Sequence, residues 1–228
     1  KGQMEIKMVN FSDVKDNPAV HTYITAANDA LGVIGFTEHG LAHATKVSGC
    51  AASVLKRYGG SEREVELARI AGYIHDMGNM INREYHALTG ATLAFQILNS
   101  MGMPPEEIAV VCAAIGNHDE GSGESVNRVS AALILADKSD VRRSRVRTPD
   151  TNGFREDIHD RVNYAVTKSW LEVYDDRDEI CLKITIDTSI CPVIEYFKIF
   201  TTRMFMCKGA SEFLGARFSL TINNTVLM

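Results

Sequence analysis

The stretch GYIHDMGN, residues 72–79, ends an apolar run with a histidine beside an aspartate. Such a pair can hold a metal ion, but a dipeptide alone has little weight because short motifs often match by chance. The chain contains three such pairs, at residues 75–76, 118–119 and 159–160. The residues around each pair therefore have to decide which of them belongs to a site.

Composition limits the classes of protein to which the chain can belong. Its 228 residues suit one domain with a small addition, and a hydrophobic content of 45% provides a sizeable core. The net charge of −5 argues against nucleic-acid binding, and no apolar run reaches the ~20 residues that span a membrane. The segment KGQMEIKMVNF lacks the apolar stretch of a signal peptide, and the cysteines show no CxxC spacing. We therefore expect a cytoplasmic protein whose metal ligands are nitrogen and oxygen.

Residues 1 to about 150 are predicted to be helical. Apolar residues recur at helical spacing between Pro18 and Leu31, and we expect a helix from Thr37, as its N-cap, to Tyr58. The pattern Ser61-x-x-Glu64 predicts a capping box at the start of the helix that carries the opening motif, and Gly78 is expected to end that helix. Further helices are expected over residues 86–100, 105–116 and 127–140.

From about residue 170 the period of the apolar residues changes to two. This pattern predicts a β-hairpin around the acidic turn DDRDE, a long helix from about 192 to 215, and a third strand carrying Phe218, Leu220 and Ile222. The expected fold class is therefore mainly α, with a helical domain at residues 1–168 and a small ββαβ (α+β) unit at residues 169–228 packed on it. That unit could complete a cleft or form a homodimer.

Histidine and aspartate recur on the inward faces of the predicted helices. His43 shares an apolar stripe, and His75 and Asp137 each follow an apolar residue by four positions. A single buried histidine is most often a hydrogen-bonded core residue, but a buried carboxylate without a partner costs several kcal/mol. A cation is the usual remedy. His86 and His118 lie at helix ends, where a side chain can reach into a cleft.

The order of these residues is His43, His75–Asp76, His86, His118 and Asp137. It is similar to the H…HD…H…H…D pattern of the HD-domain superfamily of metal-dependent phosphohydrolases, over roughly residues 20–145. HATKVSGCAASVL resembles the family's HxxRVA helix, and YIHDMGN resembles its LHDIGK motif. HALTGATLAFQIL resembles HPxxGAxIL, and ILADKSD resembles LADxxD. Four matches in the same order are far more specific than the dipeptide.

The resemblance implies an HD-type helical bundle with a dinuclear metal site. One metal would be held by His43, His75, Asp76 and Asp137, and the second by His86 and His118, with Asp76 as the bridge. Imidazole and carboxylate suit Fe, Mn or Zn, and the family favours two ions of Fe or Mn. The implied activity is hydrolysis of a phosphate ester of a nucleotide or another small molecule through a metal-bridging hydroxide.

The chain departs from the family at several positions. Asn117–His118 replaces the two adjacent histidines of the cyclic-di-nucleotide phosphodiesterases, and NHDEGSGES lacks their GYP tripeptide, which argues against cyclic-di-GMP hydrolysis. Asn79 stands where relatives often carry lysine. His39, with Glu38 beside it, stands where some members place a glutamate that binds a third metal. We expect both residues to face solvent.

A basic run, DKSDVRRSRVR, begins at the last predicted ligand. Charge runs are usually solvated, but this position favours Lys138, Arg142 and Arg145 as catalytic residues, with Asp76, because cations stabilise a phosphoryl group in transfer. Asp119 and Glu120 could orient a ligand histidine or a water molecule.

Three functions fit this pattern. The first is the phosphohydrolase. The second is a diiron oxygenase, similar to myo-inositol oxygenase, that uses the same six ligands. The third is a non-catalytic sensor that binds a nucleotide, which the intact ligand set argues against. The basic run favours a phosphorylated substrate. The pair His159–Asp160 lies outside the motif order, and we expect it to be structural or on the surface.

Overall fold

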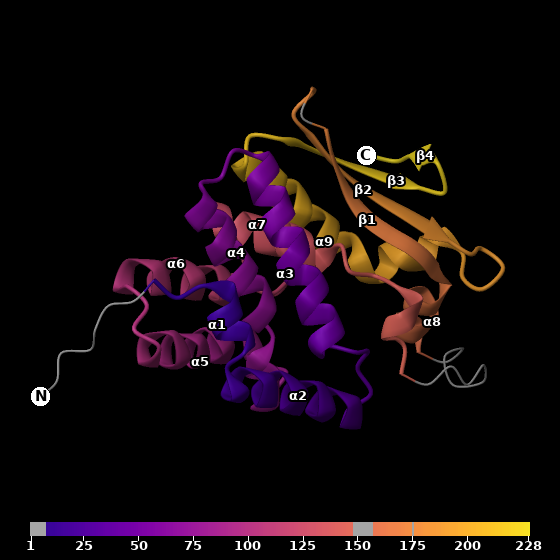
Figure 1. Ribbon diagram of the computed structural model, residues 1–228. Helices are drawn as coiled ribbons and strands as arrows, with labels where there is room; N and C mark the ends of the chain where they lie inside the picture. Colours follow the sequence, from indigo (N-terminus) through magenta and orange to yellow (C-terminus); the bar gives the residue numbers. More distant parts are fainter. Residues whose placement is uncertain (1–7, 148–156, 175) are drawn as a thin grey trace, which may run out of the picture.

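Helices fill the first two thirds of the chain, and a small sheet lies near its C-terminal end (Figure 1). The computed structural model describes residues 8–147, 157–174 and 176–228. The helices of the bundle are α1 (Phe11–Lys15), α2 (Pro18–Val33), α3 (Leu41–Arg57), α4 (Glu62–Ile74), α5 (His86–Ser100), α6 (Pro105–Gly116) and α7 (Arg128–Lys138). Two short 3-10 helices, η1 (Met77–Met80) and η2 (Arg143–Arg145), follow α4 and α7. None of the helices in these described ranges is both long and apolar enough to cross a membrane.

Local side chains determine where several helices begin. The predicted capping box at the start of α4 is present, because the Ser61 hydroxyl accepts from the backbone N–H of Glu64, whose carboxylate accepts from the N–H of Ser61. Asn127 and Ser130 cap α7 in the same reciprocal way. Helix α4, which carries the opening motif, ends at Ile74 rather than at Gly78, and the 3-10 helix η1 begins directly after Asp76.

The expected cap at Thr37 is wrong, because α3 begins at Leu41 with Gly40 as its N-cap. Two arginines from the basic run hold the segment before α3 in a non-helical conformation. Arg147 donates to the carbonyl of Phe36, and the Glu38 carbonyl accepts from Arg145. Because these carbonyls bind guanidinium groups, they are not available for helical hydrogen bonds.

The C-terminal part forms one sheet with the order β1-β2-β3-β4. Its strands are β1 (Val166–Tyr174), β2 (Glu179–Ile186), β3 (Arg217–Ile222) and β4 (Thr225–Val226), with α8 (Ile158–Ala165) before β1 and α9 (Val193–Phe213) before β3. The pair β1–β2 is the predicted antiparallel hairpin, and β3 runs parallel to β2. The short strand β4 was not predicted, because two residues are too few for a period-two pattern. The fold class is the expected one: mainly α, with a small C-terminal α+β addition.

Helix α9 packs between α7 of the bundle and the sheet (Figure 1). Its buried residues Tyr196, Phe200 and Met204 belong to the same core cluster as Leu182 on β2 and Leu220 on β3. That cluster also contains the apolar residues of α3, α4 and α7, so one continuous core joins the bundle to the sheet. The predicted boundary between residues 168 and 169 falls inside β1. Burial in a shared core fixes the position of α9 against the bundle.

Two glycines allow the backbones around the opening motif to approach one another. A Cβ atom at Gly72 would lie 2.9 Å from the Cα atom of Ser48, where α4 crosses α3. A Cβ atom at Gly78 would lie 2.0 Å from the carbonyl oxygen of His86 at the start of α5. The close crossings bring α3, the end of α4 and α5 together around residues 75–76.

The variant Gly72→Ala should destabilise the protein by about 1–3 kcal/mol, because its methyl group would force α3 and α4 apart. The matched control is Gly49→Ala on α3, where a Cβ atom would meet nothing within 4 Å. That control should raise the unfolding free energy by about 0.5–1 kcal/mol, because alanine is the better helix former. Urea unfolding measures both, and a Gly72→Ala protein as stable as the control would contradict the close crossing.

Candidate metal centre

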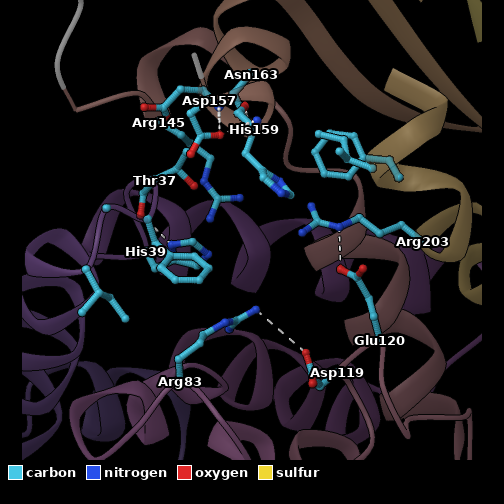
Figure 2. A pocket seen from close by; sticks show the side chains of 16 residues that line it. Thr37, His39, Arg83, Asp119, Glu120, Arg145, Asp157, His159, Asn163 and Arg203 are labelled. Atoms are coloured by element: carbon cyan, nitrogen blue, oxygen red, sulfur yellow. Dashed lines mark hydrogen bonds and ion pairs between the residues drawn. The ribbon is translucent and has the colours of Figure 1, made fainter. Parts of the chain in front are cut away.

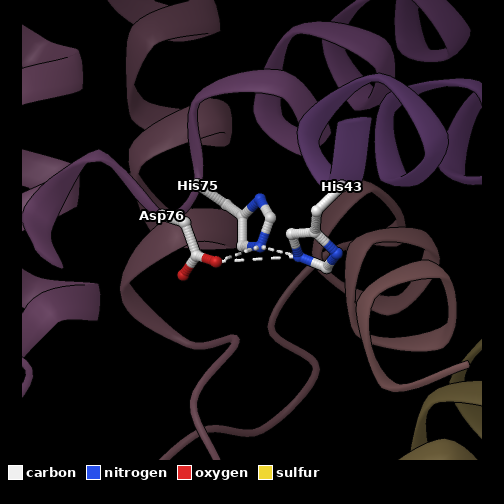
Figure 3. A group of neighbouring side chains, drawn as sticks. All are labelled: His43, His75 and Asp76. Atoms are coloured by element: carbon white, nitrogen blue, oxygen red, sulfur yellow. Dashed lines mark hydrogen bonds and ion pairs between the residues drawn. The ribbon is translucent and has the colours of Figure 1, made fainter. Parts of the chain in front are cut away.

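All six residues predicted as metal ligands converge at one place in the bundle. They come from α3 (His43), the end of α4 (His75), the turn into η1 (Asp76), the first position of α5 (His86), the residue pair after α6 (His118) and α7 (Asp137). The four histidines are buried, and Figure 3 shows the side chains of His43, His75 and Asp76 facing one another. Coordination by these residues stays a prediction, but their convergence is a property of the fold.

The carboxylate of Asp76 lies between two pairs of imidazoles. Its Oδ2 atom is 3.4 Å from Nε2 of His75 and 3.6 Å from Nε2 of His43. Its Oδ1 atom is 3.5 Å from Nε2 of His86 and 3.7 Å from Nε2 of His118. Ligand atoms that one ion holds at ~2.1 Å and roughly 90–110° apart are about 3.0–3.4 Å from each other. The spacing therefore leaves room for one cation at each oxygen.

A second carboxylate, that of Asp137, contacts the first pair of imidazoles. Oδ1 of Asp137 lies 3.3 Å from Nε2 of His43 and 3.6 Å from Nε2 of His75. Within the part of the chain that the structure describes, the groups able to hold a cation are His43–His75–Asp76, His75–His118–Asp137 and Asp76–His86–His118. These overlapping triads share their members, so the residues form one cluster rather than separate sites.

The second nitrogen of each imidazole determines what the cluster can bind. Each Nδ1 atom donates to an acceptor: His43 to Asp140, His75 to the Gly72 carbonyl, His86 to the Arg83 carbonyl, and His118 to the Ile115 carbonyl, at 2.6–3.0 Å. A neutral ring that donates through Nδ1 has a lone pair at Nε2. The Nε2 atoms of His43 and His75 are 3.4 Å apart, and those of His86 and His118 are 3.2 Å apart. Lone pairs facing one another beside two carboxylates fit a cation.

The charges around the cluster favour a positive ion in it. Burial alone would raise the pKa of Asp76, but His75 and His118 outweigh it and hold that pKa well below its usual value. Burial also opposes ionisation of Asp137, yet Lys138 and the neighbouring imidazoles keep its pKa low. Burial opposes protonation of His75, but Asp76 and Asp137 raise its pKa, whereas burial lowers the pKa of His86 to about 4. Ionised carboxylates and a neutral imidazole are the protonation states that bind metal ions.

Asp140 is a functional residue that the sequence analysis did not identify. Its Oδ2 atom accepts the Nδ1 proton of His43 at 2.8 Å, and the side chain is fully buried. Lys46 and Arg142 contact its other oxygen at 2.7 and 2.9 Å. A carboxylate in this position orients a ligand histidine and increases its basicity. The signal was present in the sequence, because Asp140 follows Asp137 by three residues in ILADKSD.

Asn79, which replaces the lysine of many relatives, has a comparable role for Asp76. Its side-chain amide donates to Oδ1 of Asp76 at 3.0 Å and to the Asp76 carbonyl at 3.0 Å. The amide oxygen of Asn79 in turn accepts from Arg83 at 3.4 Å. The orientation of the central carboxylate is therefore fixed by a neutral residue.

The basic run divides into residues near the centre and residues that hold loops. Lys138 is buried and lies 2.7 Å from Oδ2 of Asp137. Arg142 donates to Asp140 and Ser144, on the Nδ1 side of His43, and its catalytic role stays a prediction. Arg143 binds the carbonyl of Tyr164 and stacks on its ring, which joins η2 to α8.

A cavity of about 340 Å³ opens beside the cluster (Figure 2). Arg83 lines it and lies 3.2 Å from Nε2 of His86, so the cavity and the cluster share a wall. His39, expected to face solvent, lines the cavity instead, with its ring 5.5 Å from that of His43. His159, expected to be structural or on the surface, is exposed at the cavity wall.

The C-terminal part of the chain supplies one side of this cavity. Helix α9 contributes Phe200 and Arg203, and α8 contributes His159 and Asn163. Figure 2 shows Arg203, His159 and Asn163 around this space. Neither Arg83 nor Arg203 was predicted from the sequence: Arg83 lies between two ligand motifs, three residues before His86, and Arg203 lies far from all of them. Packing of α9 against α7 brings Arg203 to the cavity. The C-terminal unit therefore lines part of this cavity through α9.

Comparison with known proteins gives three findings. The HD domain family model matches residues 40–162. The uncharacterized protein MJ1020 of Methanocaldococcus jannaschii is 28% identical to this chain over 166 residues. The match covers 63% of this chain and 63% of the length of that relative. A crystal structure of a predicted HD superfamily hydrolase from an uncultured Thermotogales bacterium has 23% identity and a TM-score of 0.42, over 58% of this chain and 75% of that one.

The variant Asp140→Asn should weaken divalent metal binding by about 10–100-fold, because His43 loses the carboxylate that orients it. Competition with a chromogenic chelator measures the affinity. The control Asp29→Asn makes the same charge change at an exposed position of α2 and should bind metal like the wild type. Equal affinities of the two variants would show that Asp140 does not support a ligand.

Proposed function

The chain belongs to the HD domain family, and from that premise we propose that it is a metal-dependent phosphohydrolase acting on a phosphate ester of a small molecule. The observation that carries the proposal is the convergence of four Nε2 lone pairs on the carboxylates of Asp76 and Asp137. Imidazole lone pairs and carboxylate oxygens that face one another in this way are suited to cations.

We propose two divalent ions, of iron or manganese. His43, His75 and Asp137 would hold one, His86 and His118 would hold the other, and Asp76 would contribute one oxygen to each. The chemistry that such ions supply is Lewis acidity, which polarises a phosphoryl oxygen and lowers the pKa of a water molecule. Nitrogen and oxygen donors of this kind are typical of Fe, Mn and Zn sites.

The chain's own residues would bind and orient the phosphate ester. Lys138, with its Nζ atom 2.7 Å from Asp137, places positive charge directly beside the cluster. Asn79 and Asp140 hold Asp76 and His43 in fixed orientations, so the ligand atoms need no reorganisation when substrate binds. Glu120, which lines the cavity, lies 3.7 Å from Lys138 and also accepts from Arg203.

The arginines of the cavity favour an anionic substrate, which a phosphohydrolase requires. Arg83, Arg145 and Arg203 line a single cavity beside the cluster, and guanidinium groups bind phosphate oxygens in pairs. An oxygenase would use the same six ligands, so the ligand set alone does not separate the two activities. Substrate-dependent oxygen uptake is the result that distinguishes them.

The wild type should release phosphate from small phosphomonoesters when supplied with Mn²⁺ or Fe²⁺, and chelation should abolish the release. Asp76→Ala should reduce it to background, because both ion positions lose a ligand. Asp29→Ala serves as the control and should retain full activity. Phosphate release that survives both chelator and Asp76→Ala would refute the metal-dependent reaction, and oxygen uptake without phosphate release would favour the oxygenase.

A further inference from the structure

Three arginines from separate elements meet at the cavity beside the metal cluster, which we term the arginine cavity. Arg83 precedes α5, Arg145 ends η2, and Arg203 lies on α9. Figure 2 shows their guanidinium groups directed toward the same open space. A hydrolytic centre of two ions needs positive charge at the phosphoryl group alone, so a second concentration of cations calls for its own explanation.

Arg145 has a buried donor without an acceptor. Its side chain is 4% exposed, its Nε donates to the carbonyl of Glu38, and its Nη1 donates to the carbonyl of Asp140, both at 2.8 Å. Its Nη2 atom is buried and makes no hydrogen bond in the described structure. A buried guanidinium donor without a partner is costly, and an anion in the cavity would remove that cost.

Arg145 lies on a different side of His43 from the metal-binding atoms. Its Nη1 atom is 3.9 Å from Oδ2 of Asp140, which binds the Nδ1 side of the His43 ring. The ligand atom of His43 is Nε2, on the opposite side of that ring. An oxyanion bound by Arg145 is therefore a different group from a phosphate held at the ligand atoms.

The other two arginines are anchored by acids and aromatic rings. Arg203 donates through Nε to Glu120 and lies 4.3 Å above the ring of Phe200. Arg83 lies 4.0 Å from Asp119 and 5.4 Å from the centre of the Phe36 ring. Anchoring through one edge directs the remaining N–H groups of Arg203 toward the cavity (Figure 2).

The same stacking argues against a nucleobase as the occupant. Phe36 and Phe200 are the phenyl rings of the lining, and each has a guanidinium against it. A base would need an open aromatic face, whereas both phenyl rings support cations and the other rings of the lining are the imidazoles of His39 and His159. Four acids also reach the cavity. Asp119 and Glu120 bind Arg83 and Arg203, and Asp157 caps α8 through the N–H of His159. Partial burial and the neighbouring Asp157 raise the pKa of the fourth, Asp160, and so oppose its negative charge. Arg145 keeps an unused donor, so the cavity fits an anion.

We propose that the arginine cavity binds a second anionic group of the substrate, so that the substrate is a compact molecule with an oxyanion at each end. One end is the phosphate ester at the metal cluster, and the other is a phosphate or carboxylate at Arg145, Arg203 and Arg83. This inference rests on the proposed phosphohydrolase function for the first end only. The second end is defined by arginines that ligate no metal.

The first test measures anion binding without metal or turnover. Inorganic phosphate should raise the melting temperature of chelator-treated wild type, and Arg203→Gln should weaken that binding about tenfold. Arg217→Gln on the sheet, 73% exposed, removes the same charge and should leave phosphate binding unchanged. Arg145→Lys is a second variant that keeps the charge but loses Nη2, and it should also bind phosphate more weakly. Phosphate binding that is equal in all four proteins would overturn the proposal.

The second test compares matched substrates. A short diol carrying one phosphate is compared with the same diol carrying two and with a phosphorylated hydroxy acid of equal length. The wild type should show a kcat/KM at least about tenfold higher for one of the doubly anionic substrates, and Arg203→Gln should reduce that ratio toward one. Hydrolysis of all three at equal kcat/KM would overturn the second anionic group and leave the phosphohydrolase standing. Arginine-dependent phosphate binding without any hydrolysis would support the cavity and refute the proposed function.

Discussion

The structure depends on one unusual constraint: four imidazole lone pairs and two carboxylates face one another in the buried centre of the helical bundle. Acceptors fixed by the fold hold each Nδ1 proton, so every Nε2 atom presents a lone pair inward. Such an arrangement is repulsive unless positive charge lies within it. The close crossings at Gly72 and Gly78 bring the backbones near enough for this arrangement to form.

Charged residues surround this centre at two distances: some contact the ligand residues, and others line the neighbouring cavity. Asp140 accepts a hydrogen bond from Nδ1 of His43 and lies beside Arg145 and Lys46. These groups outweigh burial and keep the pKa of Asp140 far below its usual range. Beyond these contacts, the arginine cavity is lined by residues of the bundle and of α9. The C-terminal sheet thus affects the centre indirectly, by holding the helix that carries Arg203.

Sequence patterns predicted the residues whose positions follow from local periodicity. The inward stripes of the helices identified His43, His75 and Asp137, and the capping box at Ser61 marked the start of α4. Contacts between distant segments were not predictable in this way. Arg203 reaches the cavity only because α9 packs on α7, and the expected cap at Thr37 failed because distant arginines bind the carbonyls of that segment. The spacing of Asp140 from Asp137 could be seen in the sequence, but its role became evident only from its contact with His43 in the structure.

The most direct measurement is the metal content of wild-type protein purified without chelator, determined by elemental analysis against protein concentration. The account predicts two divalent ions per chain, of iron or manganese, because Asp76 presents one oxygen to each pair of imidazoles. Protein that contains no metal, and takes up none when dialysed against either ion, would contradict it.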